Sequence, residues 1–282
     1  MVIFVAIISF LGWFIGEYFF QGSGVAFAFF TIIFSSISSV WSYYYSDKMV
    51  LQISHARVVT PEENYDLHNL VENMSIASGI PKPKIYMIDD TAMNAFATGR
   101  DPQHGVICFT SGIVQGLEKR ELEGVIAHEM SHIGNHDTLL MCVVSVLVGT
   151  IALMSNWFTR GMFYGGRRRR GSSDLGGLLL IIGLVLLILS PIIATLIKLA
   201  ISRSREYLAD ATSALVTRYP KGLADALKKL AADQQVLEVA SEATSHLYIE
   251  DPMVHNEGAN WFSSLFDTHP PIEERIKRLE SM

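Results

Sequence analysis

Four long apolar runs dominate the hydrophobic pattern of this chain. Two lie near its start, at Val2–Phe20 and Gly24–Tyr45, and two lie in its middle, at Leu139–Phe158 and Leu175–Ala200. Each run is close to the ~20 residues that an α-helix needs to cross the hydrocarbon core of a bilayer. The pattern therefore predicts four transmembrane helices, paired as two hairpins.

The first apolar run is expected to remain in the mature protein. A secretory signal peptide has a basic residue before its apolar stretch and a pattern of small residues at its cleavage site. Neither feature accompanies Val2–Phe20, and the residues 21–24 look like a short turn into the second run. The run is therefore predicted to anchor the chain.

The segments between these runs show the hydrophobic patterns of both helices and strands, which predicts an α+β fold. Thr60-Pro61-Glu62-Glu63 has the order of an N-cap, an N1 proline and a capping-box acid, which predicts a helix that begins here and ends at Gly79. Runs of β-type residues bounded by turn signals predict strands at 84–88, 95–98 and 106–110. Further helices are expected through the residues 119–132, from Glu206 toward Arg218, from Lys221 into the 230s, and through Ile272, Ile276 and Leu279.

Composition supports a membrane protein and argues against several functions. Half of the residues are hydrophobic and the mean hydropathy is +0.30, which is too apolar for an ordinary soluble domain. The formal net charge of −6 gives no reason to expect a nucleic acid as partner, and the chain has no Gly-rich phosphate loop. Cys108 lies in a strand-like run and Cys142 in an apolar run, so we expect no disulfide between them.

The candidate chemistry begins at His128-Glu129-Met130-Ser131-His132, an H-E-x-x-H pattern. Residues four apart lie on one face of a helix, so both imidazoles can bind one metal ion while Glu129 stays beside it. The preceding residues 119–127 combine helix formers with an apolar set, which favours a helix that runs into the motif. The alternative is two ordinary histidines on an amphipathic helix, so further ligands are needed to decide.

A catalytic zinc site has three protein ligands and one open position. His136 lies one turn beyond His132, but a ligand there would sit about 6 Å farther along a straight helix, too far to close a tetrahedron. Glu206 is the better candidate, because Asp210 follows it by one turn and can accept the spare N–H of a zinc-binding histidine. We therefore expect His128, His132 and Glu206 to bind the metal, with Asp210 orienting a ligand.

Four motifs follow one another along the chain: Asn94-Ala95-Phe96-Ala97-Thr98-Gly99, Val125 to His132 with Asp137, Ser202 to Asp210, and Thr268-His269-Pro270-Pro271 with Arg275. In these motifs and their order the chain resembles the HtpX-type integral-membrane zinc metallopeptidases, relatives of the CAAX prenyl proteases. The resemblance covers nearly the whole chain and implies a zincin-like catalytic domain with one Zn²⁺ per chain. It also implies Glu206 as the third zinc ligand and Glu129 as the residue that activates the zinc-bound water.

The resemblance gives roles to two segments that are ambiguous by themselves. It implies that Asn94, Ala95, Phe96 and Ala97 form the strand edge to which an extended substrate adds through main-chain hydrogen bonds. Without the resemblance, this segment would be taken as an ordinary strand. It implies in the same way that His269 points into the cleft and stabilises the charged tetrahedral intermediate, although a His before two prolines is often a turn residue.

The ligand positions predict how the chain is organised. If His132 and Glu206 bind one ion, the segment between them crosses the membrane an even number of times, most simply as a hairpin, and the site lies near the bilayer surface. The expected parts are an N-terminal transmembrane hairpin at 1–46, a first catalytic part at 47–138, a second hairpin at 139–200 and a second catalytic part at 201–282.

Orientation is the point at which the residues and the resemblance disagree. The family's catalytic domain faces the cytoplasm, at the inner membrane of a bacterial-type cell. This orientation places the Arg167–Arg170 run on the far side, against the tendency of Lys and Arg to stay in the cytoplasm. Lys48, Arg57, Lys198 and other basic residues flank the catalytic side and favour the cytoplasm. We expect a cytoplasmic catalytic domain, with the arginine run at lipid head groups or in a hairpin that does not fully cross.

The expected function is a membrane-embedded zinc endopeptidase that acts on membrane proteins and unfolded polypeptides. The resemblance implies quality control of misfolded membrane proteins. One alternative is a prenyl-protein protease, which the small number of spans disfavours. The other is a catalytically idle membrane scaffold stabilised by zinc, which would not need Glu129 and would usually have a fourth Cys or His ligand.

Overall fold

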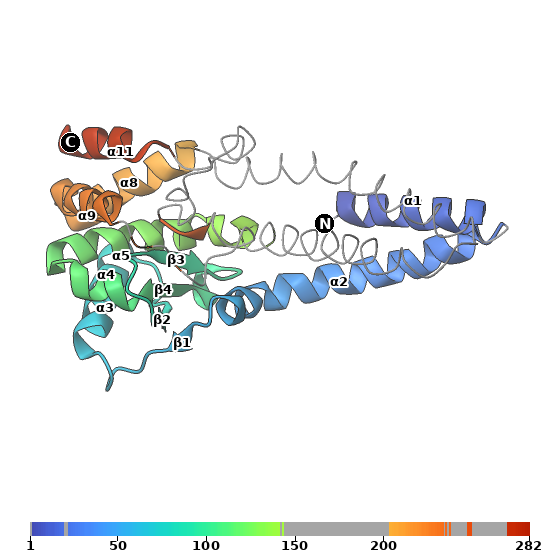
Figure 1. Cartoon of the computed structure of the whole chain (residues 1–282), viewed down its shortest axis with the longest axis horizontal. Helices are drawn as coiled ribbons and strands as arrows, with labels where there is room; N and C mark the ends of the chain where they lie inside the picture. Colours follow the sequence, from blue (N-terminus) through green and yellow to red (C-terminus); the bar gives the residue numbers. More distant parts are fainter. Residues whose placement is uncertain are drawn as a thin grey trace, which may run out of the picture. The chain divides into compact units, whose positions relative to one another are not determined.

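The computed structural model of the chain describes residues 2–19, 22–141, 143, 203–233, 235, 237, 247–249 and 270–282 (Figure 1). Its backbone contacts divide the chain into two compact units. One comprises Met1–Tyr45 with Leu147–Ile193, and the other comprises Ser46–Val146 with Ala194–Met282. All the motifs described above fall in the second unit.

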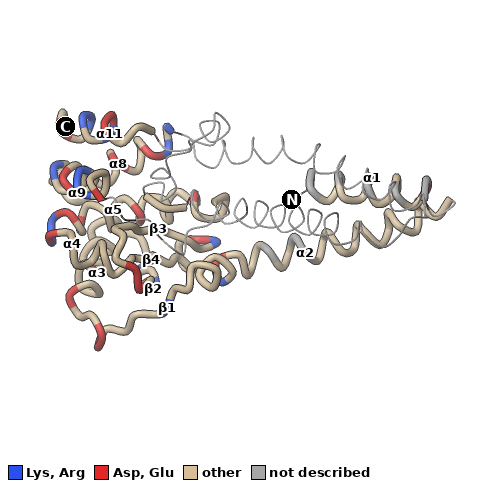
Figure 2. Tube along the Cα trace, viewed as in Figure 1, with Lys and Arg blue, Asp and Glu red and all other residues tan. Residues whose placement is uncertain are grey.

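Two helices with few charged residues form the described part of the first unit, and the second of them continues into the second unit. α1 (Val2–Phe19) contains Glu17, and α2 (Gly24–Ile53) has its first charged residue at Asp47. Figure 2 shows both helices largely without the colours of charged residues. These helices occupy the first two predicted apolar runs. Among the described helices, none is both long enough and apolar enough to cross a membrane. The other two predicted runs lie outside the described residues, apart from the start of the first, at residues 139–141 and 143.

A four-stranded mixed sheet in the order β1-β2-β4-β3 forms one layer of the second unit. β1 (Arg57–Val58) pairs antiparallel with β2 (Lys84–Ile88), and β2 runs parallel to β4 (Val106–Thr110). β3 (Ala95–Thr98) pairs antiparallel with β4 and forms the other edge. The three longer strands lie where the sequence predicts them, whereas the two residues of β1 are too few to show a period.

The predicted start of the first helix in this unit is wrong. α3 (Tyr65–Ser78) begins after Asn64, whose side chain accepts a hydrogen bond from the Leu67 N–H. Thr60 instead belongs to a separate turn, in which its own N–H donates to Glu63. The predicted end is confirmed, since Gly79 has a φ of 72°, in the left-handed region that favours glycine.

α5 (Lys119–Gly134) is the central helix of the second unit and carries the H-E-x-x-H motif. It begins with a capping box formed by Glu118 and Glu121. It packs against β3 and β4 of the sheet and against helices on its other sides. Every residue from Glu121 to Ile133 is buried, so the motif lies in the interior of the protein.

The remaining helices follow the predicted periods closely. α8 (Arg203–Thr217), α9 (Pro220–Ala232) and α11 (Ile272–Glu280) all pack against one another, and α8 and α9 also pack against α5 (Figure 1). The short α4 (Ser111–Gly116) follows β4, and a 3₁₀ helix, η1 (Pro102–His104), precedes β4. The α9 face that was predicted to be apolar, with Leu223, Leu227 and Leu230, is fully buried.

The alternation of side chains along β3 and β4 divides the core in two. Ala95, Ala97, Ile107 and Phe109 join the larger cluster with the buried residues of α3, α5 and α9. Phe96 and Cys108 point to the opposite face, where they meet a smaller cluster that includes Tyr248. The sheet face that carries Ala95 and Ala97 is therefore the one that α5 covers.

Candidate metal centre and active site

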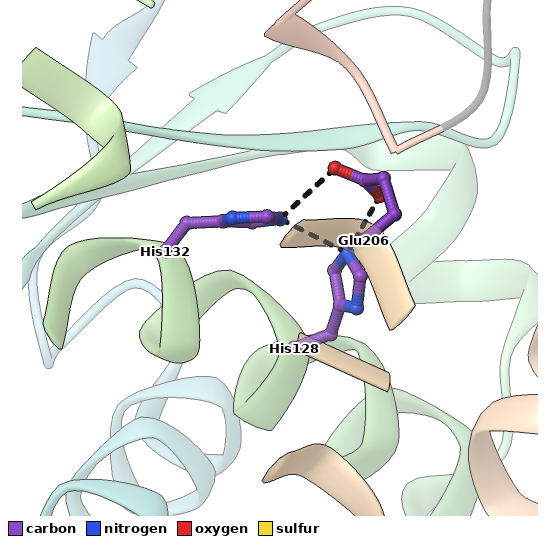
Figure 3. A group of neighbouring side chains, drawn as sticks. All are labelled: His128, His132 and Glu206. Atoms are coloured by element: carbon purple, nitrogen blue, oxygen red, sulfur yellow. Dashed lines mark hydrogen bonds and ion pairs between the residues drawn. The ribbon is translucent and has the colours of Figure 1, made fainter. Parts of the chain in front are cut away.

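Two helices bring the three predicted metal ligands together. His128 and His132 project from α5, and Glu206 projects from the first turns of α8 (Figure 3). The Nε2 atoms of the two histidines lie 3.3 Å apart. The carboxylate oxygens of Glu206 lie 3.6 Å from His128 Nε2 and 3.5 Å from His132 Nε2. All three side chains are buried, and each can offer one atom to a shared ion.

The separations of these donor atoms fit a tetrahedral metal ion. With metal–nitrogen bonds of about 2.0–2.1 Å, two ligands of a tetrahedral zinc lie about 3.4 Å apart. The 3.3 Å between the two histidine nitrogens is close to that value, and each nitrogen lies 3.5–3.6 Å from a different oxygen of the Glu206 carboxylate. Two imidazole nitrogens and one carboxylate also make up a donor set of catalytic zinc sites.

A carboxylate orients each histidine from its other nitrogen. His128 Nδ1 lies 3.0 Å from Asp210 Oδ1, as the sequence predicts. His132 Nδ1 lies 3.2 Å from Asp137 Oδ2, and Arg205 in turn forms an ion pair with Asp137. Because the Nδ1 sides are held by carboxylates, the Nε2 atoms point toward Glu206 and toward each other.

The electrostatics of the centre favour a bound cation. Burial alone would lower the pKa of His128, but hydrogen bonds to Asp210 and Glu206 raise that pKa to about 9. The site thus takes up positive charge readily, and a metal ion would take the place of the proton. Three buried carboxylates, those of Glu129, Glu206 and Asp210, surround a single buried guanidinium, that of Arg275. When the three carboxylates and the guanidinium are all ionised, the centre has a net charge of −2, which a divalent cation would neutralise.

Arg275 of α11 reaches into this centre from the C-terminal helix. Its guanidinium donates to both oxygens of Asp210, at 2.9 and 2.7 Å, and lies 3.6 Å from Glu206 Oε2. Burial alone would raise the pKa of Asp210, but the charge of Arg275 and the hydrogen bond of His128 lower it to about 2. Asp210 is therefore an ionised partner for His128 at neutral pH.

Glu129 lies beside the ligands and shares their pocket. The pocket is lined by these groups together with one residue of β3, Ala97, and with the segment Leu247–Ile249. Burial raises the pKa of Glu129 above that of an ordinary glutamate. A carboxylate of raised pKa next to a metal position is suited to accept a proton from water and to release it again.

The predicted substrate edge borders the same pocket. The Thr110 N–H donates to the Asn94 carbonyl, so in the antiparallel pair Asn94 and Phe96 face β4 with their backbone groups. Ala95 and Ala97 then point their backbone groups to the other side of β3, with which no described strand pairs and which is called the free edge below. The Ala95 carbonyl accepts a hydrogen bond of 2.9 Å from the N–H of Ile249.

The side chains of this predicted edge have different surroundings. The Asn94 Oδ1 accepts from the Ala95 N–H at 3.0 Å and thus secures the start of the strand. Phe96 packs edge-to-face on Tyr248, with ring centroids 5.1 Å apart, on the sheet face away from α5. Of the four residues, Ala97 is the one that lines the pocket.

Two other predicted residues have different outcomes. The expectation that His136 lies one turn farther along the same helix is wrong, because α5 ends at Gly134 and His136 is exposed with a φ of 60°. This turn is what returns the chain so that Asp137 reaches His132. His269 lies outside the described residues, although its neighbour Pro270 is buried.

The sequence predicts no separate roles for Asp137, Arg205 and Arg275. All three appear in it only as parts of the motifs that carry the resemblance. The position of Asp137, five residues after the second histidine, was a usable signal, since zinc-binding histidines usually have a carboxylate partner. The contacts of Arg205 and Arg275 depend on tertiary structure and have no local signal.

Comparisons with known proteins agree with this centre. Residues 61–282 match the family model of peptidase family M48. The whole chain is 47% identical to a Protease HtpX homolog from Caldanaerobacter subterraneus subsp. tengcongensis and 46% identical to one from Thermoanaerobacter pseudethanolicus, and it covers 93% of each. The crystal structure of S. mikatae Ste24p has a similar fold, with a TM-score of 0.52 at 17% identity, over 98% of this chain and 62% of that one.

The family match includes every residue of the metal centre, from His128 on α5 to Arg275 on α11. It also extends over far more than half of the chain, and the HtpX relatives match the rest. The chain therefore belongs to peptidase family M48 and is a metallopeptidase.

Proposed function

We propose that this chain is a membrane-embedded zinc endopeptidase that hydrolyses misfolded or damaged membrane proteins. The observation that carries the peptidase chemistry is the convergence of His128, His132 and Glu206 beside Glu129 in one pocket. An idle scaffold would have no use for a buried carboxylate of raised pKa at that position. Likeness to HtpX proteases supports the hydrolysis of peptide bonds.

The residues of the proposed catalytic site have separate tasks. His128, His132 and Glu206 would hold one zinc ion, which when bound supplies Lewis-acid polarisation of the scissile carbonyl and of the attacking water. Glu129 accepts a proton from that water and passes it to the leaving nitrogen. Asp210 orients His128, and His269 is proposed to stabilise the negative charge of the tetrahedral intermediate.

The substrate is proposed to bind as an extended strand on the free edge of β3. The backbone groups of Ala97 point to that edge, and Ala97 also lines the pocket. Main-chain pairing of this kind is largely independent of the substrate's side chains. It requires an extended segment, which unfolded polypeptides provide and compact domains do not.

The proposed membrane topology comes from the sequence. Four apolar runs supply two hairpins, at 1–46 and 139–200, and the catalytic domain at 47–138 and 201–282 is proposed to face the cytoplasm from the inner membrane of a bacterial-type cell. His132 and Glu206 share one candidate site and so must lie on the same side of the membrane. The segment between them is therefore proposed to cross an even number of times.

The test of this function compares purified wild-type protein with Glu129→Gln, using Glu123→Gln on the same helix as a matched control. Metal is removed with a chelator and then replaced with Zn²⁺, and zinc content and casein cleavage are measured. The wild type is expected to regain cleavage with about one zinc per chain. Glu129→Gln should keep zinc and lose about 10²- to 10⁴-fold in rate, because an amide cannot accept the proton.

The outcomes separate the alternatives. Cleavage by Glu129→Gln at the wild-type rate would remove Glu129 as the base. Full zinc occupancy without cleavage in the wild type and the Glu123→Gln control would favour the idle scaffold.

A further inference from the structure

We propose that Arg275 is a positioning residue that ties the metal ligand His128 to the substrate edge of β3. The inference rests on the proposed function, in which His128 binds a metal ion and β3 binds the substrate peptide. It follows from a continuous series of hydrogen bonds in which the guanidinium of Arg275 is the central member.

The first half of the series leads to the metal ligand. Arg275 Nε and Nη2 donate to the two oxygens of Asp210, and Asp210 Oδ1 lies 3.0 Å from His128 Nδ1. This two-pronged contact fixes the plane of the carboxylate, as a planar guanidinium does with a carboxylate. The carboxylate in turn fixes the rotation of the imidazole, and so the direction of His128 Nε2.

The second half of the series leads to β3. Arg275 Nη1 donates to the Ile249 carbonyl at 3.3 Å, and the Ile249 N–H donates to the Ala95 carbonyl at 2.9 Å. Ala95 is the free-edge residue two positions before Ala97, which lines the pocket. The guanidinium that orients His128 thus also holds the segment lying on the strand edge.

The burial of Arg275 shows that its contacts are internal ones. Its side chain is 1% exposed, whereas the next arginine of α11, Arg278, is 51% exposed. Arg278 pairs with Glu274 on the same helix and packs over the ring of Tyr207. Two arginines on one helix therefore have different tasks, one at the metal centre and one at the surface.

Lysine cannot replace Arg275 in this position. The contacts to Asp210 and Ile249 use three nitrogens of one planar group, and a lysine has a single ammonium at the end of a flexible stem. An Arg275→Lys variant would keep the charge, so that the buried carboxylates remain compensated, but it would lose the fixed geometry. The variant therefore separates positioning from charge compensation.

The experiment uses the full-length protein with Arg275→Lys and, as a matched control, Arg278→Lys. Co²⁺ replaces zinc, because its visible absorption spectrum reports the geometry of the ligands. Zinc affinity is measured by competition with a chelating dye, and kcat and KM are measured on a peptide substrate. Arg275→Lys should change the Co²⁺ spectrum, weaken zinc binding by about 10- to 100-fold and raise KM. Arg278→Lys should match the wild type in all three.

A double variant guards against simple misfolding. Asp210→Asn with Arg275→Met removes one negative and one positive charge together, so the net charge of the buried centre is unchanged. If Arg275 acts on the metal through Asp210, the zinc affinity of the double variant should equal that of Asp210→Asn alone. The KM of the double variant should still exceed that of Asp210→Asn, because the contact with Ile249 is also lost.

The result that overturns the proposal is an Arg275→Lys protein with the spectrum, zinc affinity and KM of the wild type. Fully additive losses of zinc affinity in the double variant would also contradict it. A wild-type protein that binds neither Co²⁺ nor zinc would instead contradict the proposed function itself, so the two failures are distinct.

Discussion

At the scale of single residues, a carboxylate and an arginine hold each of the two candidate histidine ligands on the side away from the metal position. His128 has Asp210 and Arg275, and His132 has Asp137 and Arg205. The rotation of each imidazole about its Cβ–Cγ bond is therefore restricted. The two Nε2 atoms already lie 3.3 Å apart, a separation that fits two ligands of one ion. Such a centre loses little entropy when it binds metal, which favours affinity.

The identity of the third ligand is a prediction at this scale. Glu206→Ala should lose nearly all bound zinc, because it removes one of three donors. His136→Ala should keep it, because His136 is exposed beyond the end of α5. Zinc per chain, measured by atomic absorption after exhaustive dialysis, is the readout. Loss of zinc from His136→Ala together with retention in Glu206→Ala would reverse the assignment.

The ligands could be predicted from the sequence because their spacing is local. His128 and His132 are four apart on a helix, and Glu206 and Asp210 repeat that spacing on another. The error at His136 arose because the helix was extended past the point where the chain turns. Gly134-Asn135 is a pair common at helix C-termini and indicates an end there, whereas the positive φ of His136 has no such signal, since a residue with positive φ is more often glycine than histidine.

At the scale of elements, α5 determines where the site lies, and its close packing on α9 keeps it there. The Cβ of an alanine at position 124 would lie 2.7 Å from the backbone nitrogen of Leu223. Only a glycine allows the two helices to approach this closely. The hydroxyl of Ser213 on α8 also donates to the Gly124 carbonyl at 2.7 Å.

Gly124→Ala should destabilise the protein by about 1–3 kcal/mol, because the added methyl group meets backbone that cannot yield. Gly134→Ala is the control on the same helix. Its Cβ would meet only the mobile end of the Ile80 side chain, and alanine is the better helix former by about 1 kcal/mol. Chemical denaturation curves measure both changes. Equal stability of the two variants would show that α9 does not restrict α5.

The free edge of β3 gives a second prediction for an element. Ala97→Pro removes an N–H that points away from β4, and proline is tolerated at such an edge position. KM for an unstructured peptide should rise, while zinc content stays that of the wild type. Val58→Pro on β1, at the opposite edge of the sheet, serves as the control. An unchanged KM for Ala97→Pro would place the substrate elsewhere.

The strands and most helices could be predicted from their residues, but the start of α3 could not. Thr60 is followed by an N1 proline and a capping-box acid, and Asn64 is itself a favoured N-cap residue, so the local signals conflict. In the structure Glu63 accepts from the Thr60 N–H and also pairs with Arg57 at the surface, within a turn that precedes α3. A cap pattern does not show which of two neighbouring caps the chain uses.

At the scale of the whole molecule, the open prediction is the proposed topology. Single cysteines are introduced at Lys119, Glu257 and Ser172 in a protein without Cys108 and Cys142. An impermeant thiol reagent added to intact cells should label the Ser172 position and leave the other two unlabelled. This follows if the segment between His132 and Glu206 crosses an even number of times from the cytoplasm.

Two labelling results would contradict different parts of this topology. Labelling at Lys119 and Glu257, but not at Ser172, would reverse the orientation and keep the hairpin. Labelling at only one of Lys119 and Glu257 would place the two catalytic parts on opposite sides, which the shared metal centre does not allow.

The metal centre also joins two distant parts of one chain. His132 ends the part before the second predicted hairpin, and Glu206 begins the part after it. An ion held by both would act as a cross-link, which by loop-closure entropy is worth about 4.5 kcal/mol for a loop of this length. Chelation should then weaken the docking of α8, α9 and α11 on α5, so that a peptidase stripped of its metal becomes a substrate for others.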